Sequence, residues 1–141
     1  MKSAALKRGS PSKRRKRPMA ARRRGAKGSL AWQCDAVWRR LVKAAWGHTC
    51  AVCGATCDLE SHHLIGRGHM RTRYELRNGM CLCRYHHRCA QGRAKAFQAW
   101  LLAANPALVT WVETNRNGTV TATEAWYREQ LQRLRELESE A

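Results

Sequence analysis

Two short cysteine and histidine motifs constrain the fold of this chain more than any other feature of its sequence. A Cys-x2-Cys motif, Cys50 and Cys53, is followed about thirty residues later by a Cys-x2-His motif, Cys83 and His86. Two intervening residues let a tight turn direct both side chains at one ion, and Zn²⁺ binds four such ligands in a tetrahedron. The surrounding segment has few apolar residues, so bound metal would supply folding free energy that a hydrophobic core otherwise supplies. We predict a structural zinc site at these four residues, with a pair of free thiols as the alternative.

The remaining cysteines leave some freedom in the choice of ligands. Cys57, Cys81 and Cys89 lie close enough in the sequence to replace one of the four, whereas Cys34 is expected to be a buried free thiol. The total of seven cysteines is odd, and no apolar segment typical of an export signal follows the basic start of the chain. Cysteines grouped with histidines in this way favour a reducing compartment and metal binding over a disulfide framework.

The positive charge of the chain is concentrated at its beginning. Of 27 Lys and Arg residues, 12 lie in residues 1–27, which contain none of the 10 acidic residues, and the formal net charge is +17. Such a segment has almost nothing apolar to bury, so we expect residues 1–29 to form a disordered arm. Its charge density favours a nucleic acid, with DNA as our expectation; RNA, an anionic membrane or a purely solubilising role are the alternatives. The expected DNA-binding residues of the arm are Lys13, Arg14, Arg15, Lys16 and Arg17.

Periodicity and turn residues predict a helical frame around the cysteine-rich segment. A helix is expected to begin near Asp35, as its N-cap, and to end at Gly47. Strands are expected at 58–64 and 80–82, joined by a basic loop at 66–77, with a helix over 84–104 that is broken near Gly92. Residues 106–122 are ambiguous. Thr123 is expected to cap a last helix, for packing or for a homodimer, whose narrow apolar stripe is Tyr127, Leu131 and Leu134.

Four further residues lie between or beside the predicted zinc ligands: His62, His63, Asn78 and His87. Phosphodiester hydrolysis needs a base that activates water near pH 7 and a cation that stabilises the leaving oxygen. Histidine suits the role of the base, because its unperturbed pKa is near 6.5. A mixed histidine and amide shell suits Mg²⁺ or Mn²⁺, or a borderline ion such as Ni²⁺ or Zn²⁺.

These motifs together resemble the HNH endonucleases, the ββα-metal or His-Me finger group, and among them small phage and prophage members of the NinG type. The resemblance covers roughly residues 36–104 and rests on Cys50-Ala-Val-Cys53, Ser61-His-His-Leu-Ile65, Arg71-Thr-Arg-Tyr74, Leu76-Arg-Asn78 and Leu82-Cys-Arg-Tyr-His-His87. It implies a metal-dependent DNA endonuclease in a bacterial cytoplasm, with an α+β fold in which helices flank a zinc-braced ββα finger. The corresponding division is a basic arm at 1–29, a nuclease domain at 30–104 and a C-terminal turn and helix at 105–141.

The resemblance also implies a role for each site residue. His63 would be the general base, His62 and His87 would bind the catalytic ion, and Asn78 would orient the base and help to place the metal. His86 takes a zinc position that is commonly cysteine, and His62 a metal position that is often aspartate, so the preference for Mg²⁺ and the division of His86 and His87 between the two metals stay open.

The loop between the predicted strands carries three arginines that suit contacts with a scissile phosphate: Arg67, Arg71 and Arg73. A plain zinc finger has no use for such a loop, and this favours the nuclease over an inactive finger with two zinc ions. A zinc-finger protein that binds nucleic acid without cutting it, and a protein directed at RNA, are the other candidate functions.

Overall fold

The computed structural model describes residues 28–141, so the predictions made for the basic residues of 1–27 lie outside the described residues. The first element is helix α1, Leu30–Ala45. It begins earlier than predicted, because Ser29 and not Asp35 is its N-cap: the Ser29 hydroxyl accepts a hydrogen bond of 3.2 Å from the Trp32 N–H. Asp35 lies within the helix, which frees its carboxylate for a tertiary contact.

A two-stranded antiparallel hairpin follows, made of β1, Leu59–His63, and β2, Gly79–Cys83. His62 pairs with Met80 and His63 with Gly79. The loop between the strands ends in a short 3-10 turn, Leu76–Asn78. Gly79 has a packing role, because a Cβ atom there would collide with the Val42 side chain of α1. The hairpin can therefore lie directly against the first helix.

Four helices complete the chain: α2, Arg84–Gly92; α3, Ala94–Ala104; α4, Pro106–Asn115; and α5, Glu124–Glu140. The predicted break near Gly92 and the predicted cap at Thr123 are both confirmed. The ambiguous segment contains α4, which starts where the Asn105 side chain accepts a hydrogen bond of 3.0 Å from the Leu108 N–H. Pro106 occupies the first turn of α4, where its missing N–H costs nothing.

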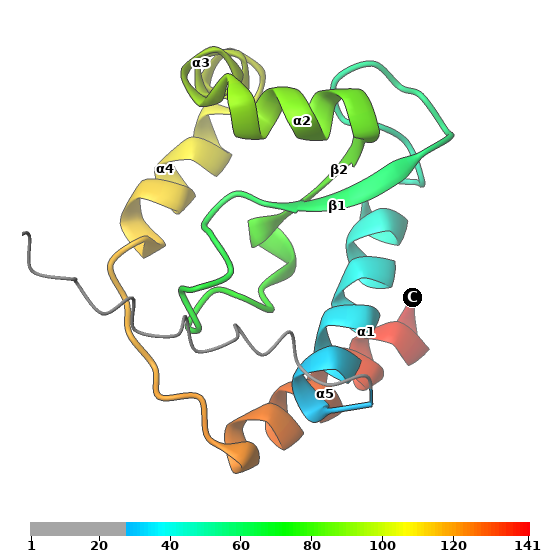
Figure 1. Cartoon of the computed structure of the whole chain (residues 1–141), viewed down its shortest axis with the longest axis vertical. Coiled ribbons are helices and arrows are strands. Elements are labelled where there is room, and N and C mark those ends of the chain that lie inside the picture. Colours follow the sequence, from blue (N-terminus) through cyan, green and yellow to red (C-terminus); the bar gives the residue numbers. More distant parts are fainter. Residues whose placement is uncertain (1–27) are drawn as a thin grey trace, which may run out of the picture.

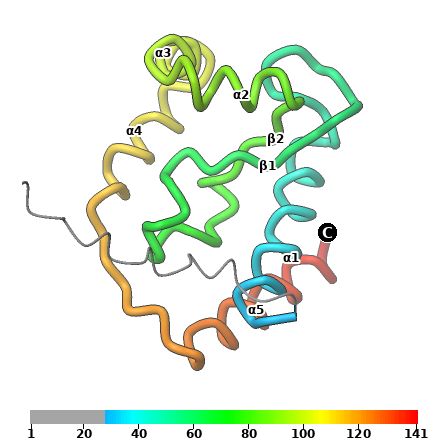
Figure 2. Tube along the Cα trace, in the orientation of Figure 1, coloured from blue at the N-terminus to red at the C-terminus, as the bar shows by residue number. Residues whose placement is uncertain are grey.

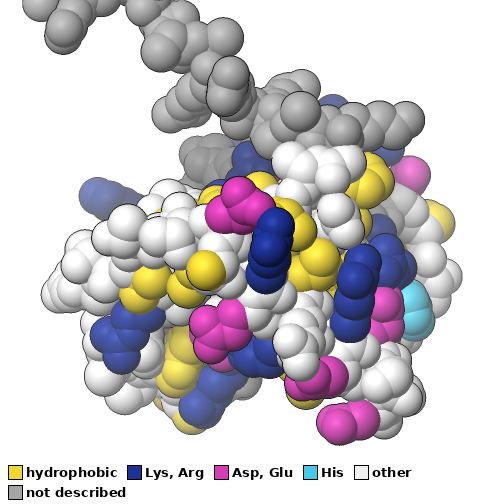
Figure 3. Space-filling view, turned by 90° about the horizontal axis from the view of Figure 1, so that it is seen from below, with side chains coloured by type: hydrophobic (Ala, Val, Ile, Leu, Met, Phe, Trp, Pro, Cys, Tyr) yellow, Lys and Arg dark blue, Asp and Glu magenta, His cyan; other side chains and the backbone are white. Residues whose placement is uncertain are grey.

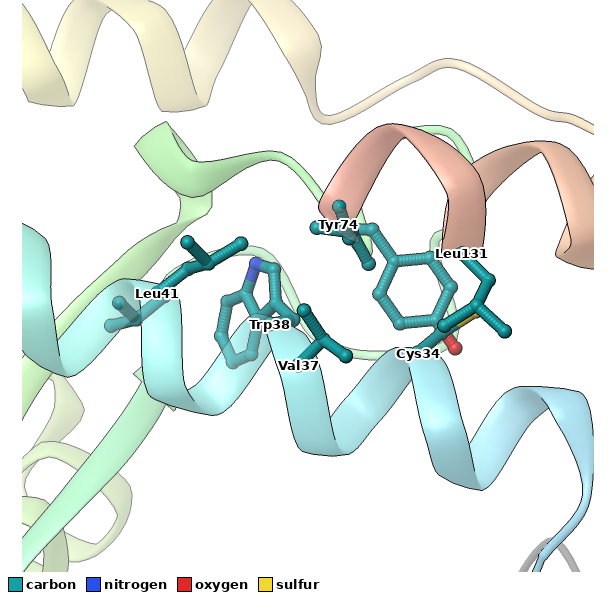
Figure 4. Close-up of a cluster of buried hydrophobic side chains, with 8 residues drawn as sticks. Cys34, Val37, Trp38, Leu41, Tyr74 and Leu131 are labelled. Atoms are coloured by element: carbon teal, nitrogen blue, oxygen red, sulfur yellow. The ribbon is translucent and has the colours of Figure 1, made fainter. Parts of the chain in front are cut away.

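The helices cover the hairpin from several sides (Figures 1 and 2). Their apolar side chains form two clusters. In one cluster α1 packs against α5, with Tyr74 buried beside them and the buried thiol of Cys34 beside Leu131 (Figure 4). Trp38 of α1 belongs to the same cluster and faces the hairpin. The apolar stripe of α5 thus contacts α1 of the same chain. The other cluster joins β2 to α2, α3 and α4 through residues such as Met80, Leu82 and Leu101.

The structure confirms a small α+β fold in which flanking helices surround a hairpin and its following helix. On the face seen from below Figure 1, basic and acidic side chains are interspersed rather than segregated (Figure 3). Within residues 28–141, no helix is both long enough and apolar enough to cross a membrane.

Candidate metal centre and active site

The four predicted zinc ligands converge at one end of the hairpin. The ligand atoms of Cys50, Cys53, Cys83 and His86 all lie within 4.8 Å of one another. The Cys50 Sγ and Cys83 Sγ atoms lie 3.6 Å and 3.2 Å from the His86 Nδ1 atom, and the Cys53 and Cys83 sulfurs are 4.0 Å apart. A tetrahedron with Zn–S near 2.3 Å and Zn–N near 2.0 Å requires separations of about 3.8 Å between sulfurs and about 3.5 Å between sulfur and nitrogen. The cluster therefore has the ligand types and the dimensions to bind a structural zinc.

Backbone hydrogen bonds hold the turn that carries Cys50 and Cys53. Gly54 has a φ of 71°, a left-handed conformation that suits glycine, and its N–H donates to the Cys50 carbonyl. The Ala51 N–H donates 2.9 Å to the Cys81 carbonyl, which fastens the turn to β2. Burial raises the pKa of the Cys50 thiol, but backbone N–H groups that include those of Cys83 and Cys53 outweigh it and lower this pKa to about 6. Metal binding needs the thiolate, so the turn favours the ligand form.

The structure also separates the residues that sequence alone left as alternatives. Among residues 28–141, the ligand atoms that converge are those of the four predicted residues, and Cys57, Cys81 and Cys89 are not part of the cluster. His86 faces the cluster, whereas its neighbour His87 lines a different pocket. The orientation of α2 about its own axis thus directs His86 to the cluster and His87 to the pocket.

That second pocket, of about 350 Å³, lies on the hairpin beside α1. Its lining comes from α1, β1, the start of the loop and α2: Asp35, Trp38, Arg39, Ser61, His62, His63, Gly66, Arg67, His87 and Gln91. Three of the four predicted catalytic-site residues therefore share one pocket, and Asn78 lies outside its lining.

His63 is held firmly on both sides. Its ring stacks on Trp38 with a centroid separation of 3.8 Å and an angle of 14°, and its Nε2 lies 3.0 Å from the Arg73 carbonyl oxygen. A carbonyl only accepts hydrogen bonds, so Nε2 carries the proton and Nδ1 is the basic nitrogen of the neutral ring. Burial lowers the pKa of His63 to about 4, although the bond to the Arg73 carbonyl acts in the opposite direction. The imidazole is consequently neutral at pH 7, with its Nδ1 atom unprotonated.

Asn78 supports this arrangement through the loop and not through the histidine ring. The amide of Asn78 is buried, its Oδ1 accepts 2.6 Å from the Ile65 N–H, and its Nδ2 donates 3.0 Å to the carbonyls of Ile65 and Thr72. The Oδ1 atom already accepts from the Ile65 N–H, and within the described residues no hydrogen bond joins the Asn78 side chain to His63. Asn78 therefore fixes the loop at Thr72, and the carbonyl of the following residue, Arg73, holds His63.

His87 is also oriented by a neighbouring side chain, and its ring lies next to that of His62. The Nδ1 atom of His87 lies 2.6 Å from the Glu60 carboxylate, which leaves Nε2 as its free nitrogen. The rings of His62 and His87 meet edge to face, with centroids 5.2 Å apart. Burial, with a smaller effect from the charge of His87, lowers the pKa of His62 to about 4. Two imidazoles that meet in this way can supply two ligands for a divalent cation, and a carboxylate on the far nitrogen of one is a common support for such a ligand.

The three loop arginines have three different environments. Arg67 is exposed and lines the pocket. Arg71 packs over Gly118, between α4 and α5, and does not line the pocket. The guanidinium of Arg73 is engaged by Asp35, with its Nη2 atom 2.8 Å from Oδ2 and its Nε 3.2 Å from Oδ1. Arg73 therefore acts at this site through its backbone carbonyl, while its side chain anchors the loop to α1.

Several site residues escaped the sequence analysis. Asp35 was read as a helix cap, and Glu60, Arg39 and Gln91 carried no expectation, because nothing in their local sequence separates them from ordinary surface residues. Trp38 is buried, and its stacking on His63 depends on the tertiary fold. Comparison with protein-family models, curated proteins and solved structures gives no match for this chain.

Proposed function

We propose that this protein is a metal-dependent endonuclease that hydrolyses phosphodiester bonds in DNA by an HNH-type mechanism, in phage or prophage DNA processing or recombination. The observation that carries the proposal is the shared pocket of an oriented, neutral His63 and the facing pair His62 and His87. A base with a fixed tautomer next to two free imidazole ligands is the combination that hydrolysis of a phosphodiester requires.

The proposed reaction assigns each side chain one task. His63 accepts through Nδ1 a proton from a water molecule, whose oxygen forms a bond to phosphorus as the bond to the 3′ oxygen breaks. The departing 3′ oxygen takes a proton from solvent water, which leaves a 5′ phosphate and a 3′ hydroxyl. Trp38 and the Arg73 carbonyl keep the ring of His63 from rotating, and Asn78 keeps that carbonyl in place. Mg²⁺ or another divalent ion held by His62 and His87 would stabilise the charge on the leaving oxygen.

Supercoiled plasmid nicking tests the proposal. Full-length protein with its zinc retained is incubated with Mg²⁺, Mn²⁺, Ni²⁺ or no added divalent ion, and nicking is expected only with an added ion. His63→Ala should reduce the single-turnover rate about 10² to 10⁴-fold, the usual contribution of a general base, with little change in DNA affinity. His87→Ala should lose as much but recover in part at raised metal concentration, because its defect is in metal affinity.

Two further variants keep the test decisive. His69 is exposed and does not line the pocket, so His69→Ala is the matched control and should nick at the wild-type rate. His63→Gln retains a polar planar group against Trp38 in case the alanine variant is unfolded. Nicking by folded His63→Gln at the wild-type rate would remove His63 as the base. DNA binding without nicking under every metal would instead favour a zinc-finger protein that does not cut.

A further inference from the structure

The charges that line the catalytic pocket do not balance. Asp35 supplies the carboxylate of the pocket lining. Arg73 neutralises this charge, with its Nη2 atom 2.8 Å from the Asp35 Oδ2 atom, and both side chains are less than one-fifth exposed. The two arginines of the lining, Arg39 and Arg67, form no ion pair with any carboxylate of the described residues 28–141. Within the described part of the chain, the pocket thus presents two positive charges that no carboxylate pairs, beside its histidines.

Arg39 is placed there by the packing of α1 on the hairpin. The Ser61 hydroxyl donates a hydrogen bond of 3.0 Å to the Arg39 carbonyl, so this turn of α1 is fastened to the strand that carries His62 and His63. Ser61 and His63 lie two residues apart on one strand and therefore point to the same face. The exposed Arg39 side chain starts from this fixed position.

The next residue in the chain shows that this placement is specific. Arg40 lies on another side of α1 and pairs with Glu138 of α5, with 2.6 Å between Nε and the carboxylate oxygen. Arg40 therefore forms an ion pair within the protein, whereas Arg39 lines the pocket and has no carboxylate partner among the residues that the structure describes.

We propose that Arg39 binds a non-bridging phosphate oxygen of the nucleic acid backbone and forms, with Arg67, a phosphate-binding subsite at the catalytic pocket. Guanidinium groups recognise phosphate oxygens through paired N–H donors and keep their charge at any physiological pH. Arg67 belongs to the hairpin loop, but Arg39 comes from a helix outside the hairpin and its following helix. The subsite thus makes α1 part of the substrate-binding surface. This inference rests on the proposed function only for the identity of the anion.

A comparison of Arg39→Ala with Arg40→Ala tests the subsite, because each variant removes one positive charge from the same helix. Equilibrium binding of a short DNA duplex to the full chain is measured from about 0.05 to 0.3 M salt, with no divalent ion added. One phosphate contact contributes about 0.9 to the slope of log affinity against log salt, which is about eightfold in affinity at 0.1 M salt. Arg39→Ala should show this loss, Arg40→Ala should match the wild type, and Arg39→Lys should regain most of the slope.

Nicking provides an independent readout of the same contact. A residue that binds the phosphate equally in ground state and transition state changes KM and leaves kcat nearly unchanged. Arg39→Ala should therefore raise KM about eightfold, while kcat stays within about twofold.

Equal slopes for the wild type, Arg39→Ala and Arg40→Ala would overturn the subsite, whether or not the protein nicks DNA. An equal loss in both arginine variants would also overturn it, because the effect would then be one of net charge. If the wild type binds DNA but never nicks it, the proposed function fails, and the salt slopes still decide the role of Arg39.

Discussion

The ion pair between Asp35 and Arg73 should contribute several times more to stability than the ion pair between Arg40 and Glu138. Both pairs join α1 to another part of the chain through an arginine and a carboxylate. The Asp35 and Arg73 side chains are 13% and 17% exposed, whereas Glu138 and Arg40 are 36% and 59% exposed. Asp35→Asn and Glu138→Gln each remove one charge and almost preserve the shape of the side chain, so the two variants differ mainly in burial.

The magnitudes follow from this difference. Removal of one partner of a buried pair costs about 3 to 5 kcal/mol, because the other charge stays desolvated without a counter-charge. The pair of Asp35 with Arg73 keeps slight exposure, so we expect Asp35→Asn to lower the free energy of unfolding by about 2 to 4 kcal/mol. An exposed pair contributes about 1 kcal/mol or less, and Glu138→Gln should stay within that limit. Domains of this size are stable by only about 5 to 15 kcal/mol, so the first loss is large.

Urea unfolding followed by circular dichroism measures both variants, and the urea midpoint should fall for Asp35→Asn at an unchanged m-value. Repetition at about 1 M salt should erase the small effect of Glu138→Gln but not that of Asp35→Asn, because salt screens exposed charges most strongly. Similar losses in the two variants, or a loss for Asp35→Asn that disappears in salt, would refute the argument from burial. Asp35→Asn should also slow nicking at temperatures where it is folded, since Arg73 holds His63 through its carbonyl.

Three further results are expected. Cys53→Ser should lose about one bound zinc per chain and unfold the hairpin region, because a structural zinc supplies on the order of 10 kcal/mol of binding free energy. Cys57 lies outside the cluster, so Cys57→Ser should keep its zinc, measured by metal analysis, and its circular dichroism spectrum. A folded wild type without zinc would contradict this. The pKa of His63 is about 4 in the folded protein and near 6.5 when unfolded, so the contribution of His63 to the free energy of unfolding is complete above pH 6.5 and is lost as the pH falls toward 4. His63→Gln should therefore flatten that part of the pH–stability curve. An unchanged curve would show that His63 is not buried as a neutral ring. Deletion of residues 1–27 should flatten the salt dependence of DNA binding, because 12 positive charges are removed, while nicking at low salt persists; an unchanged slope would mean that these residues do not bind DNA.

Local sequence was sufficient wherever the relevant interactions are local. The cluster of four residues that can bind zinc was predictable because each half-site is a short turn and zinc accepts few ligand types. The cap at Thr123 and the break near Gly92 were likewise readable from nearby residues. The start of α1 was not, because Ser29 and Asp35 are both good N-cap residues and a pattern of side chains cannot choose between them.

The tertiary structure decided every assignment that depends on distant partners. His86 and His87 are adjacent and chemically alike, and only the rotation of α2 directs one to the zinc cluster and the other to the pocket. Arg67 and Arg73 looked equally suited to phosphate, yet Arg73 is engaged by Asp35, 38 residues earlier in the chain. The sequence by itself determined which chemical groups this protein has and which lie near one another along the chain. Which of these groups can bind a ligand depends on contacts between segments far apart in the sequence, because burial and pairing, not residue type, decide whether a charged side chain is free to do so.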